Sequence, residues 1–480
     1  MIDDKQFLLG KDIYEETSWV SLKLSSGFIL SYHNKLNVWH DERCSIVLLG
    51  NAWQVNPDFP APIEELKQIA SNDKYTHNEV YSIEKSWCGR YLLIVGEWIY
   101  LDTIGSLGCF YSNTHVSSSL HVLCRAENRT IVYPNIIHGH SPNFIPGMKT
   151  CYDGVRRLIP SQIYNYVTGE IKTRPLVPDG AISTVNDNQR IEMLEKYFTY
   201  SLQNMASHFH GIPIWLSLTG GRDSRAALAM LEKSGIKYHT FTLWHEHITS
   251  SDVQIPLILA RRLKKEHRYI HRSADQYSQQ RYDDYRAHTA GMAVDEDWNF
   301  YAYNQYASIE KNAEEIVILR NSIWENVNDY YSIYCNEGSL DFSKFYPYAQ
   351  KDALLGESLQ EWYSYTRDDI FNQDISIWNR ILWELRTGCW LSSIEQSFDL
   401  MDGITSIQPC NCRLFLSLLI GFDQRERVAK THEEKIVNKI CPILKGIPYD
   451  YQYIPKQSFV KIIRRKAAKA YKTIKSICNT

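Results

Sequence analysis

The sequence predicts an α/β protein in two parts: an N-terminal α+β region, then a parallel sheet followed by helices. Three observations support this. The chain has 480 residues, more than one ordinary domain. Residues 1 to about 175 form short strand-like segments broken by Gly, Asn and Asp, and from about 187 strands and helices alternate. We place the domains at 1–178 and 185–455, with a basic tail at 456–480.

Composition and termini exclude several classes of protein. The chain is 44% hydrophobic and 22% charged, and its formal net charge of −3 shows no preference for nucleic acid or membrane. The first residues, MIDDKQFLLGKDIYEE, carry acids where a signal peptide needs bases, and no run reaches the roughly 18–20 apolar residues of a membrane span. Eleven cysteines without a CxxC pair suggest reduced thiols, and Cys410 with Cys412 is a weak metal signal. We expect a soluble, cytoplasmic protein.

The N-terminal region contains four segments rich in Ile, Val, Tyr and Trp, which predict strands. Residues 61–72, APIEELKQIASN, predict a helix. Residues 168–183 contain two Pro and two Gly, a pattern that predicts a linker. The predicted strand segments are 26–40, 44–55, 89–103 and 108–115.

The second part begins with an amphipathic helix at 187–206, with Asp187 or Asn188 as its cap. Strand 212–218 turns into a helix that ends near 234, where Gly235 is the stop signal. The pattern then continues as alternating elements, and beyond 275 we expect helices apart from one strand. These later elements are a strand at 237–244, a helix at 250–266, a strand at 267–272 and a strand within 314–321.

The final 25 residues, 456–480, carry eight Lys or Arg and no acid, with apolar residues near helical spacing. Two interpretations remain open. The segment is either a terminal helix packed by one face, or a docking surface for an anionic partner or membrane.

The turn after strand 212–218 reads LTGGRDS. Bare amides at a helix N-terminus favour an anion, and Gly220 and Gly221 permit its close approach. Thr219 and Ser224 add hydroxyl donors, and Asp223 could hold a Mg²⁺ ion that bridges phosphates. The alternative is an ordinary strand-to-helix turn with capping side chains.

This string resembles the SGGxDS loop of the PP-loop ATP pyrophosphatases, with Thr219 in place of the first Ser. In that superfamily the loop holds the pyrophosphate that leaves when a substrate is adenylated. The order of the two parts resembles the asparagine synthetase-like branch, in which a glutaminase-type (Ntn-type) sandwich precedes the synthetase domain. Within 86–112, the positions that match the glutaminase-type pattern are Gly89, Asp102, Gly105 and Tyr111.

The resemblance implies ATP and Mg²⁺ as cofactors and a set of site residues. Asp252 and Ala260 match the helix after the nucleotide-binding strand. Lys456 matches a lysine that supports the acyl-adenylate; the alternatives are that Lys456 is one of the eight solvated cations of the basic tail, or that Lys430 has this role. Arg222 and Arg225 are candidate phosphate contacts, although Arg225 could instead face solvent. The implied nucleotide-binding residues are Ser217, Thr219, Gly220, Gly221, Asp223, Ser224 and Thr242; the implied catalytic residues are Lys456, Glu325 and Arg222; the implied metal ligand is Asp223.

The chain departs from the branch in two further respects. Family glutaminases use an N-terminal cysteine, but this chain begins Met1-Ile2 and its first cysteine is Cys44, so we expect no glutaminase activity. In the acidic GEGxDE segment, Glu325 keeps the last acid while Asn321 and Trp324 replace the others. Residues 295–297, Asp-Glu-Asp, either supply a substitute or are solvated loop charges.

The expected function is an AMP-forming amide ligase that joins a small-molecule or peptide carboxylate to an amine or ammonia, as in lactam formation, peptide cyclisation or sugar-acid amidation. Two rival classes remain. A PP-loop enzyme of sulfur transfer or tRNA modification would need reactive cysteines and an RNA-binding module. A scaffold with a decayed catalytic loop would bind nucleotide without turnover.

Overall fold

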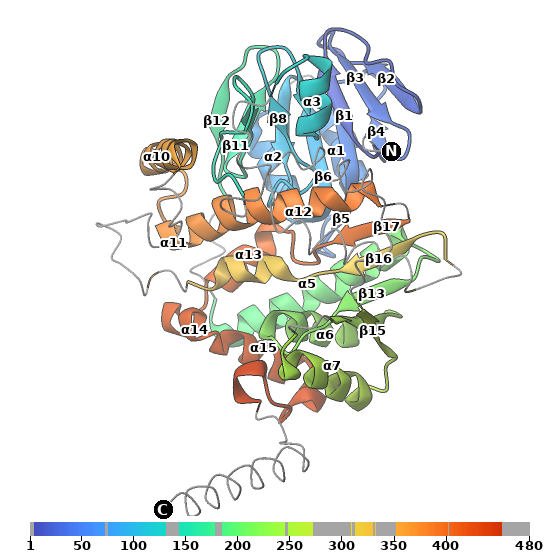
Figure 1. The fold of residues 1–480 in the computed structure, drawn as a ribbon, viewed down its shortest axis with the longest axis vertical. Coiled ribbons are helices and arrows are strands. Elements are labelled where there is room, and N and C mark those ends of the chain that lie inside the picture. The colour runs from blue at the N-terminus through green and yellow to red at the C-terminus, as the bar shows by residue number, and fades with distance from the viewer. Residues whose placement is uncertain are drawn as a thin grey trace, which may run out of the picture.

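The structure is a computed structural model that describes most of the chain. In Figure 1 an antiparallel sandwich lies at one end and a parallel sheet at the other, with helices between them. Among the described residues, no helix combines the length and apolarity needed to cross a bilayer. The described residues are 4–72, 75–130, 144–177, 185–244, 248–271, 309, 313–329, 332, 352–401 and 403–453.

The N-terminal part contains two six-stranded antiparallel sheets. The first has the order β10-β8-β9-β1-β3-β2 and the second β12-β11-β7-β6-β5-β4. The first sheet comprises β1 (Phe7–Gly10), β2 (Trp19–Lys23), β3 (Ile29–His33), β8 (Phe110–Tyr111), β9 (Val116–Ser117) and β10 (Arg156–Arg157). The second comprises β4 (Val38–His40), β5 (Ile46–Gln54), β6 (Trp87–Val95), β7 (Trp98–Leu101), β11 (Gln162–Asn165) and β12 (Ile171–Thr173).

The two sheets face each other across an apolar core. Phe7 and Leu9 of one sheet pack with Val47 and Leu92 of the other. Helices α1 (Pro62–Ser71) and α2 (His77–Glu84) cover the outer face of the second sheet, and α3 (Leu120–Ala126) packs on the first. The region is therefore the α+β sandwich that the sequence predicts.

The predicted linker at 168–183 is wrong in its first part, because residues 171–173 form strand β12. The glycine that suggested a linker instead makes a hairpin turn. Gly169 has φ +77°, a left-handed conformation that glycine adopts without strain, and lies between β11 and its partner β12. The turn signal was thus correct, but it marks a hairpin within the sheet.

Glu65 of α1 gives a prediction about pH. It is buried and accepts hydrogen bonds from Trp87 Nε1 at 2.6 Å and Gln54 Nε2 at 3.2 Å. Burial raises the pKa of Glu65 from its ordinary 4.5 to about 7. A raised folded pKa means that protonation stabilises the folded protein below pH 4.5, and that this stabilisation is lost as pH rises through about 7.

Glu65→Gln resembles the protonated form. We expect it to raise the free energy of unfolding above neutral pH by about 2 kcal/mol, after allowance for partial solvent screening, and to change it little in mild acid. Urea denaturation on each side of neutrality measures the difference. An equal effect at both pH values would contradict the assignment.

The second part contains a five-stranded sheet of order β15-β14-β13-β16-β17, and every neighbouring pair is parallel. The predicted parallel sheet is therefore confirmed. One strand, β17, lies in a region predicted to be helical. The sequence did not indicate this strand, because its four residues include Thr and Ser and form no long apolar run. The strands are β13 (Ile214–Ser217), β14 (His239–Trp244), β15 (His267–His271), β16 (Ile316–Leu319) and β17 (Ile404–Ile407).

Helices α5 (Asp187–His208), α6 (Arg222–Ser234) and α7 (Ser250–Arg262) follow the predicted alternation. Ile214 and Leu216 of β13 pack on the side of α5 and α6, whereas Trp215 points to the opposite face. Gly235 ends α6 in a left-handed conformation, as predicted. The cap of α5 is Asn186 rather than Asp187 or Asn188, because its side chain and that of Gln189 form a reciprocal capping box.

Helices after residue 352 connect the two parts. Leu359, Trp362 and Trp378 pack against Phe144 and Ile159 of the N-terminal region. The parts therefore share a continuous apolar interface. The helical elements of this region are α10 (Ala353–Arg367), α11 (Ile377–Arg380), the π-helix η6 (Ile381–Leu391), α12 (Ser392–Ser397), α13 (Arg413–Ile420), α14 (Gln424–Ala429) and α15 (Thr431–Ile440), with short 3₁₀ turns η1 (Ser322–Val327), η7 (Phe398–Leu400), η8 (Pro442–Leu444) and η9 (Asp450–Gln452).

Candidate active site

The strand order of the parallel sheet indicates where a ligand would bind. From β13 the chain moves outward through β14 and β15, and it then returns to β16 on the other side of β13. In open sheets of this kind, ligands bind at the carboxyl ends of the strands where the order reverses. The LTGGRDS segment follows β13, and Arg320 and Asn321 follow β16, so both segments lie at the point where the strand order reverses.

The loop is held in shape by its own hydroxyl groups. The Thr219 amide donates to Ser224 Oγ at 3.1 Å, and the Gly221 amide donates to Thr219 Oγ1 at 3.2 Å. The two hydroxyls lie 3.1 Å apart. Thr219 is exposed and Gly221 half-buried, whereas Gly220 and Ser224 are buried, so the loop is accessible at Thr219 and Gly221.

Helix α6 begins directly at the loop and has no side-chain cap. The amides of its first turn have no hydrogen-bond acceptor within the helix, and no capping side chain supplies one. The helix dipole also favours an anion at this end. A Cβ added to Gly221 would approach only Thr219 Oγ1, at 3.3 Å, so open space lies beyond it. The loop can accommodate a phosphate group at the helix end.

Asp252 of α7 fixes the other glycine of the loop. Its Oδ1 accepts a hydrogen bond from the Gly220 amide at 2.8 Å, and its Oδ2 accepts one from Thr249 Oγ1 at 2.7 Å. A carboxylate thus already binds one loop amide. The sequence match at Asp252 therefore has a structural role at the loop, whereas Ala260 is buried in the interior of α7.

We expect Asp252→Ala to lower the free energy of unfolding by about 1–2 kcal/mol, because the Gly220 amide loses a charge-assisted hydrogen bond. Asp252→Asn retains an oxygen at the same position and should recover most of the loss. Urea denaturation compares the three proteins. If alanine and asparagine have the same effect, the hydrogen bond does not stabilise the loop.

Asp223, in the first turn of α6, has a carboxyl oxygen, Oδ1, that is buried without a hydrogen-bond partner among the described residues. Burial raises the pKa of Asp223 to about 6, a rise that Lys430 opposes and Glu325 reinforces. Asn321 donates from Nδ2 to the Asp223 carbonyl oxygen at 2.8 Å. The structure therefore gathers Asp223, Glu325, Asn321 and Lys430 in one place.

The two arginines of the loop helix have different positions. Arg222 donates from Nε to Glu434 Oε1 at 3.0 Å and lies over the Tyr451 ring, with 4.2 Å between the guanidinium carbon and the ring centre. Arg225 is buried and donates to the carbonyl oxygens of Ile447 and Pro448. Both earlier interpretations of Arg225 are therefore wrong, since it faces neither solvent nor the loop but anchors a distant segment of the chain.

Asn321 and Trp324, which replace two acids of the predicted acidic segment, each have structural contacts. Trp324 is buried against Phe198 in the core, and Asn321 accepts a hydrogen bond from Cys410 Sγ at 2.9 Å. Glu325 lies 3.5 Å from Arg386 Nε. Asparagine and tryptophan thus serve packing and positioning at these places.

Two predicted nucleotide contacts belong to the strands. Thr242 is buried and donates from Oγ1 to the Leu218 carbonyl oxygen at 2.6 Å. Ser217 is half-buried and ends β13. The predicted catalytic Lys456, the acids at 295–297 and the basic tail lie outside the described residues, and their roles stay predictions.

Two residues of the cluster carried no sequence signal. Glu433, in the first turn of α15, and Asn328, which follows η1, are both completely buried. Burial raises the pKa of Glu433 well above its ordinary value, and the neighbouring Asp223 raises it further. These residues are distant in sequence and meet only because α15 packs on α6.

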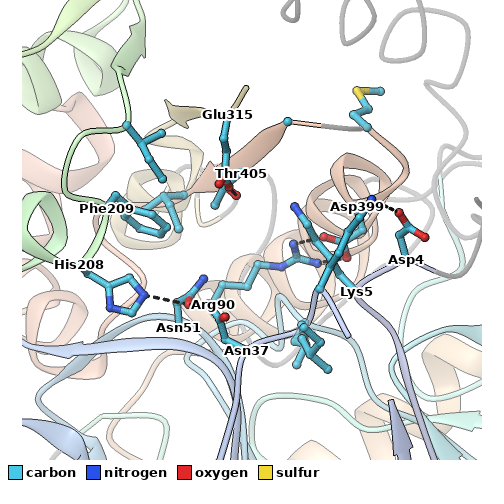
Figure 2. A pocket seen from close by; sticks show the side chains of 18 of the residues that line it. Asp4, Lys5, Asn37, Asn51, Arg90, His208, Phe209, Glu315, Asp399 and Thr405 are labelled. Carbon is cyan, nitrogen blue, oxygen red and sulfur yellow. Dashed lines mark hydrogen bonds and ion pairs between the residues drawn. The ribbon is translucent and has the colours of Figure 1, made fainter. Parts of the chain in front are cut away.

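A cavity of about 570 Å³ lies away from the loop, between the sandwich and the amino ends of β16 and β17 (Figure 2). Arg90 crosses it and forms a bidentate pair with Asp399 at 2.5 Å. His208 and Asn37 both hydrogen-bond Asn51 Oδ1. None of the described lining residues is a cysteine.

Comparison with known proteins finds little. No family model and no curated protein matches the sequence. A glutamine-dependent NAD⁺ synthetase from Acinetobacter baumannii in complex with ADP is 13% identical over 40% of this chain and 38% of its own, with a TM-score of 0.23. This chain thus covers less than two-fifths of that protein.

Two further solved structures resemble the chain to a similar degree. An NH₃-dependent NAD synthetase from Campylobacter jejuni subsp. jejuni NCTC 11168, solved with nitrate, is 14% identical over 38% of this chain and 86% of its own, with a TM-score of 0.21. An NMN synthetase from Francisella tularensis is 13% identical over 57% and 100%, with a TM-score of 0.22. Similarity of this degree carries no argument about this chain, whose candidate function therefore rests on its own geometry.

Proposed function

We propose that the protein is an ATP-dependent amide ligase that forms AMP and pyrophosphate. The observation that carries the proposal is the loop from Thr219 to Ser224, which is accessible at Thr219 and Gly221, begins α6 and lies at the reversal point of the parallel sheet. Its glycines, hydroxyls and acid are the groups that a pyrophosphate bound with Mg²⁺ would require.

The reaction proceeds in two balanced steps. A carboxylate oxygen of the substrate attacks the α-phosphorus of ATP, and the bond to the β-phosphate oxygen breaks to release pyrophosphate. The nitrogen of an amine or ammonia then attacks the acyl carbon, the bond from that carbon to AMP breaks, and the nitrogen loses a proton.

The residues of the chain have separate roles in this scheme. The first-turn amides of α6 and the Thr219 hydroxyl bind the departing pyrophosphate, and Arg222 and Lys430 contribute positive charge near it. Asp223 is the residue that fits a Mg²⁺ ion, which when bound neutralises phosphate charge. Lys456 is proposed from the family pattern alone as the cation beside the acyl-adenylate.

The test incubates the full chain with ATP, Mg²⁺, candidate carboxylic acids and amines, and measures AMP and pyrophosphate separately from ADP and phosphate. Acid-dependent formation of AMP and pyrophosphate supports the proposal. Gly221→Val serves as the blocked-loop control, because a larger side chain enters the open space at the helix end without a backbone clash.

Other outcomes identify the rival classes. Turnover that depends on tRNA and a sulfur donor indicates sulfur transfer. ATP binding that Gly221→Val abolishes, without turnover on any acid, indicates a nucleotide-binding scaffold.

A further inference from the structure

Three polar side chains from different elements meet behind the loop, two of them fully buried. Glu433 comes from α15, Asn328 from the segment after η1 and Asp223 from α6. Glu433 and Asn328 are 0% exposed. Both Glu433 oxygens, both polar atoms of the Asn328 amide and Asp223 Oδ1 have no hydrogen bond of normal geometry among the described residues. Polar atoms in this state are costly unless something binds them.

The three side chains are close enough to influence one another. Asp223 and Glu433 contact each other and interact electrostatically, and the Asn328 amide contacts the Glu433 carboxyl. Lys430 and Arg222 supply positive charge nearby, but in the described part of the chain neither forms an ion pair with Glu433. Two carboxyl groups, those of Asp223 and Glu433, therefore face each other.

The chemistry of these groups selects the class of ligand. Two carboxylates and an amide carbonyl offer oxygen atoms alone, which suit a hard divalent cation such as Mg²⁺. No group of three His, Cys, Asp or Glu side chains in the described residues is arranged to hold a metal. The third protein ligand in this site would be the Asn328 amide, and Asp223, which is only half-buried, would be the side from which water or phosphate oxygens complete the coordination.

We propose that Glu433 and Asn328 join Asp223 in binding a divalent cation at the inner side of the nucleotide loop. Glu433 then supplies the acid that Asn321 and Trp324 no longer provide. The inference deepens the proposed function, because the cation would be the Mg²⁺ that accompanies the nucleotide, but the binding itself requires no catalysis.

The experiment measures binding of Mn²⁺, as a paramagnetic substitute for Mg²⁺, to the full chain without nucleotide by electron paramagnetic resonance. Competition with Mg²⁺ gives the affinity for the native ion. We expect Glu433→Gln to weaken binding by roughly 10- to 100-fold and Asn328→Ala to weaken it less. Glu192→Gln removes an exposed acid of α5 and should bind as the wild type does.

The same variants undergo thermal unfolding with and without Mg²⁺. Mg²⁺ should raise the melting temperature of the wild type and of Glu192→Gln but not that of Glu433→Gln, which also shows that the variant folds. Equal Mn²⁺ affinity in the wild type and Glu433→Gln, or no saturable binding by the wild type, overturns the inference and leaves a proton shared between the two carboxyls.

Failure of this inference and failure of the proposed function are distinguishable. Loss of cation binding in Glu433→Gln without adenylation by the wild type would retain the site and reject the ligase. Adenylation by a wild type whose cation affinity does not depend on Glu433 would retain the ligase and reject the site.

Discussion

Replacing Asp223 by alanine should reduce the rate of acid-dependent AMP formation by about 10²- to 10³-fold, the usual cost of removing one preorganised charge-stabilising group. The same change should not lower the free energy of unfolding. Burial and the neighbouring Glu325 both raise the pKa of Asp223, which means that its ionised form is disfavoured in the folded protein. A residue that is unfavourable for folding and required for turnover is typical of a functional site.

The measurement pairs initial rates of AMP release with urea denaturation above neutral pH for wild type, Asp223→Ala and Asp223→Asn. Asn preserves the size of the side chain, so activity lost in both variants indicates a need for the charge. If Asp223→Ala is inactive because it unfolds more readily, or if it retains most of the wild-type rate, the assignment of Asp223 is wrong.

Replacing Glu84 by glutamine should lower the free energy of unfolding by about 3–5 kcal/mol. Glu84, at the end of α2, is the buried counter-ion of two arginines, Arg174 and Arg413, and lies 3.4 Å from Arg413 Nε. All three side chains are at most 2% exposed. Without the carboxylate, two guanidinium groups would face each other out of contact with water.

The pKa of Arg413 shows that its positive charge is already disfavoured. Burial, and to a lesser extent the charge of Arg174, lower this pKa to about 10. Equilibrium denaturation of Glu84→Gln measures the cost. Glu64→Gln, which removes an exposed carboxylate that pairs with Lys67 on α1, is the matched control and should have a much smaller effect. Similar values for the two variants would mean that the buried charges are compensated by other groups.

The elements that sequence could predict were those with a local signal. The loop from Thr219 to Ser224 is contiguous, and its flanking strand and helix each have a clear period, so its place at the carboxyl end of β13 followed from sequence. Gly235 was correctly predicted as the end of the helix, because the left-handed conformation at a helix end favours glycine.

The predictions that were wrong or absent have a common physical cause. In each case the residues that determine the structure are distant in sequence from the residue concerned. Strand β17 is four residues long and owes its conformation to pairing with β16. From sequence, Arg225 was a candidate phosphate ligand. In the structure its guanidinium donates to the carbonyl oxygens of residues 447 and 448, which are more than 200 positions away. Glu433 reads as a solvated helix acid and becomes buried only when α15 packs on α6.

The interface between the sandwich and the parallel-sheet part has a consequence for how the chain can be divided. Trp383 of η6 donates to the Thr103 carbonyl oxygen at 2.7 Å, and Trp53 of β5 donates to Ser201 Oγ at 2.9 Å. Separating the two halves would expose the indoles of Trp383 and Trp53 to water. It would also remove apolar partners of Trp362 and Trp378, such as Phe144 and Ile159. The N-terminal half therefore completes the apolar interior of the other half.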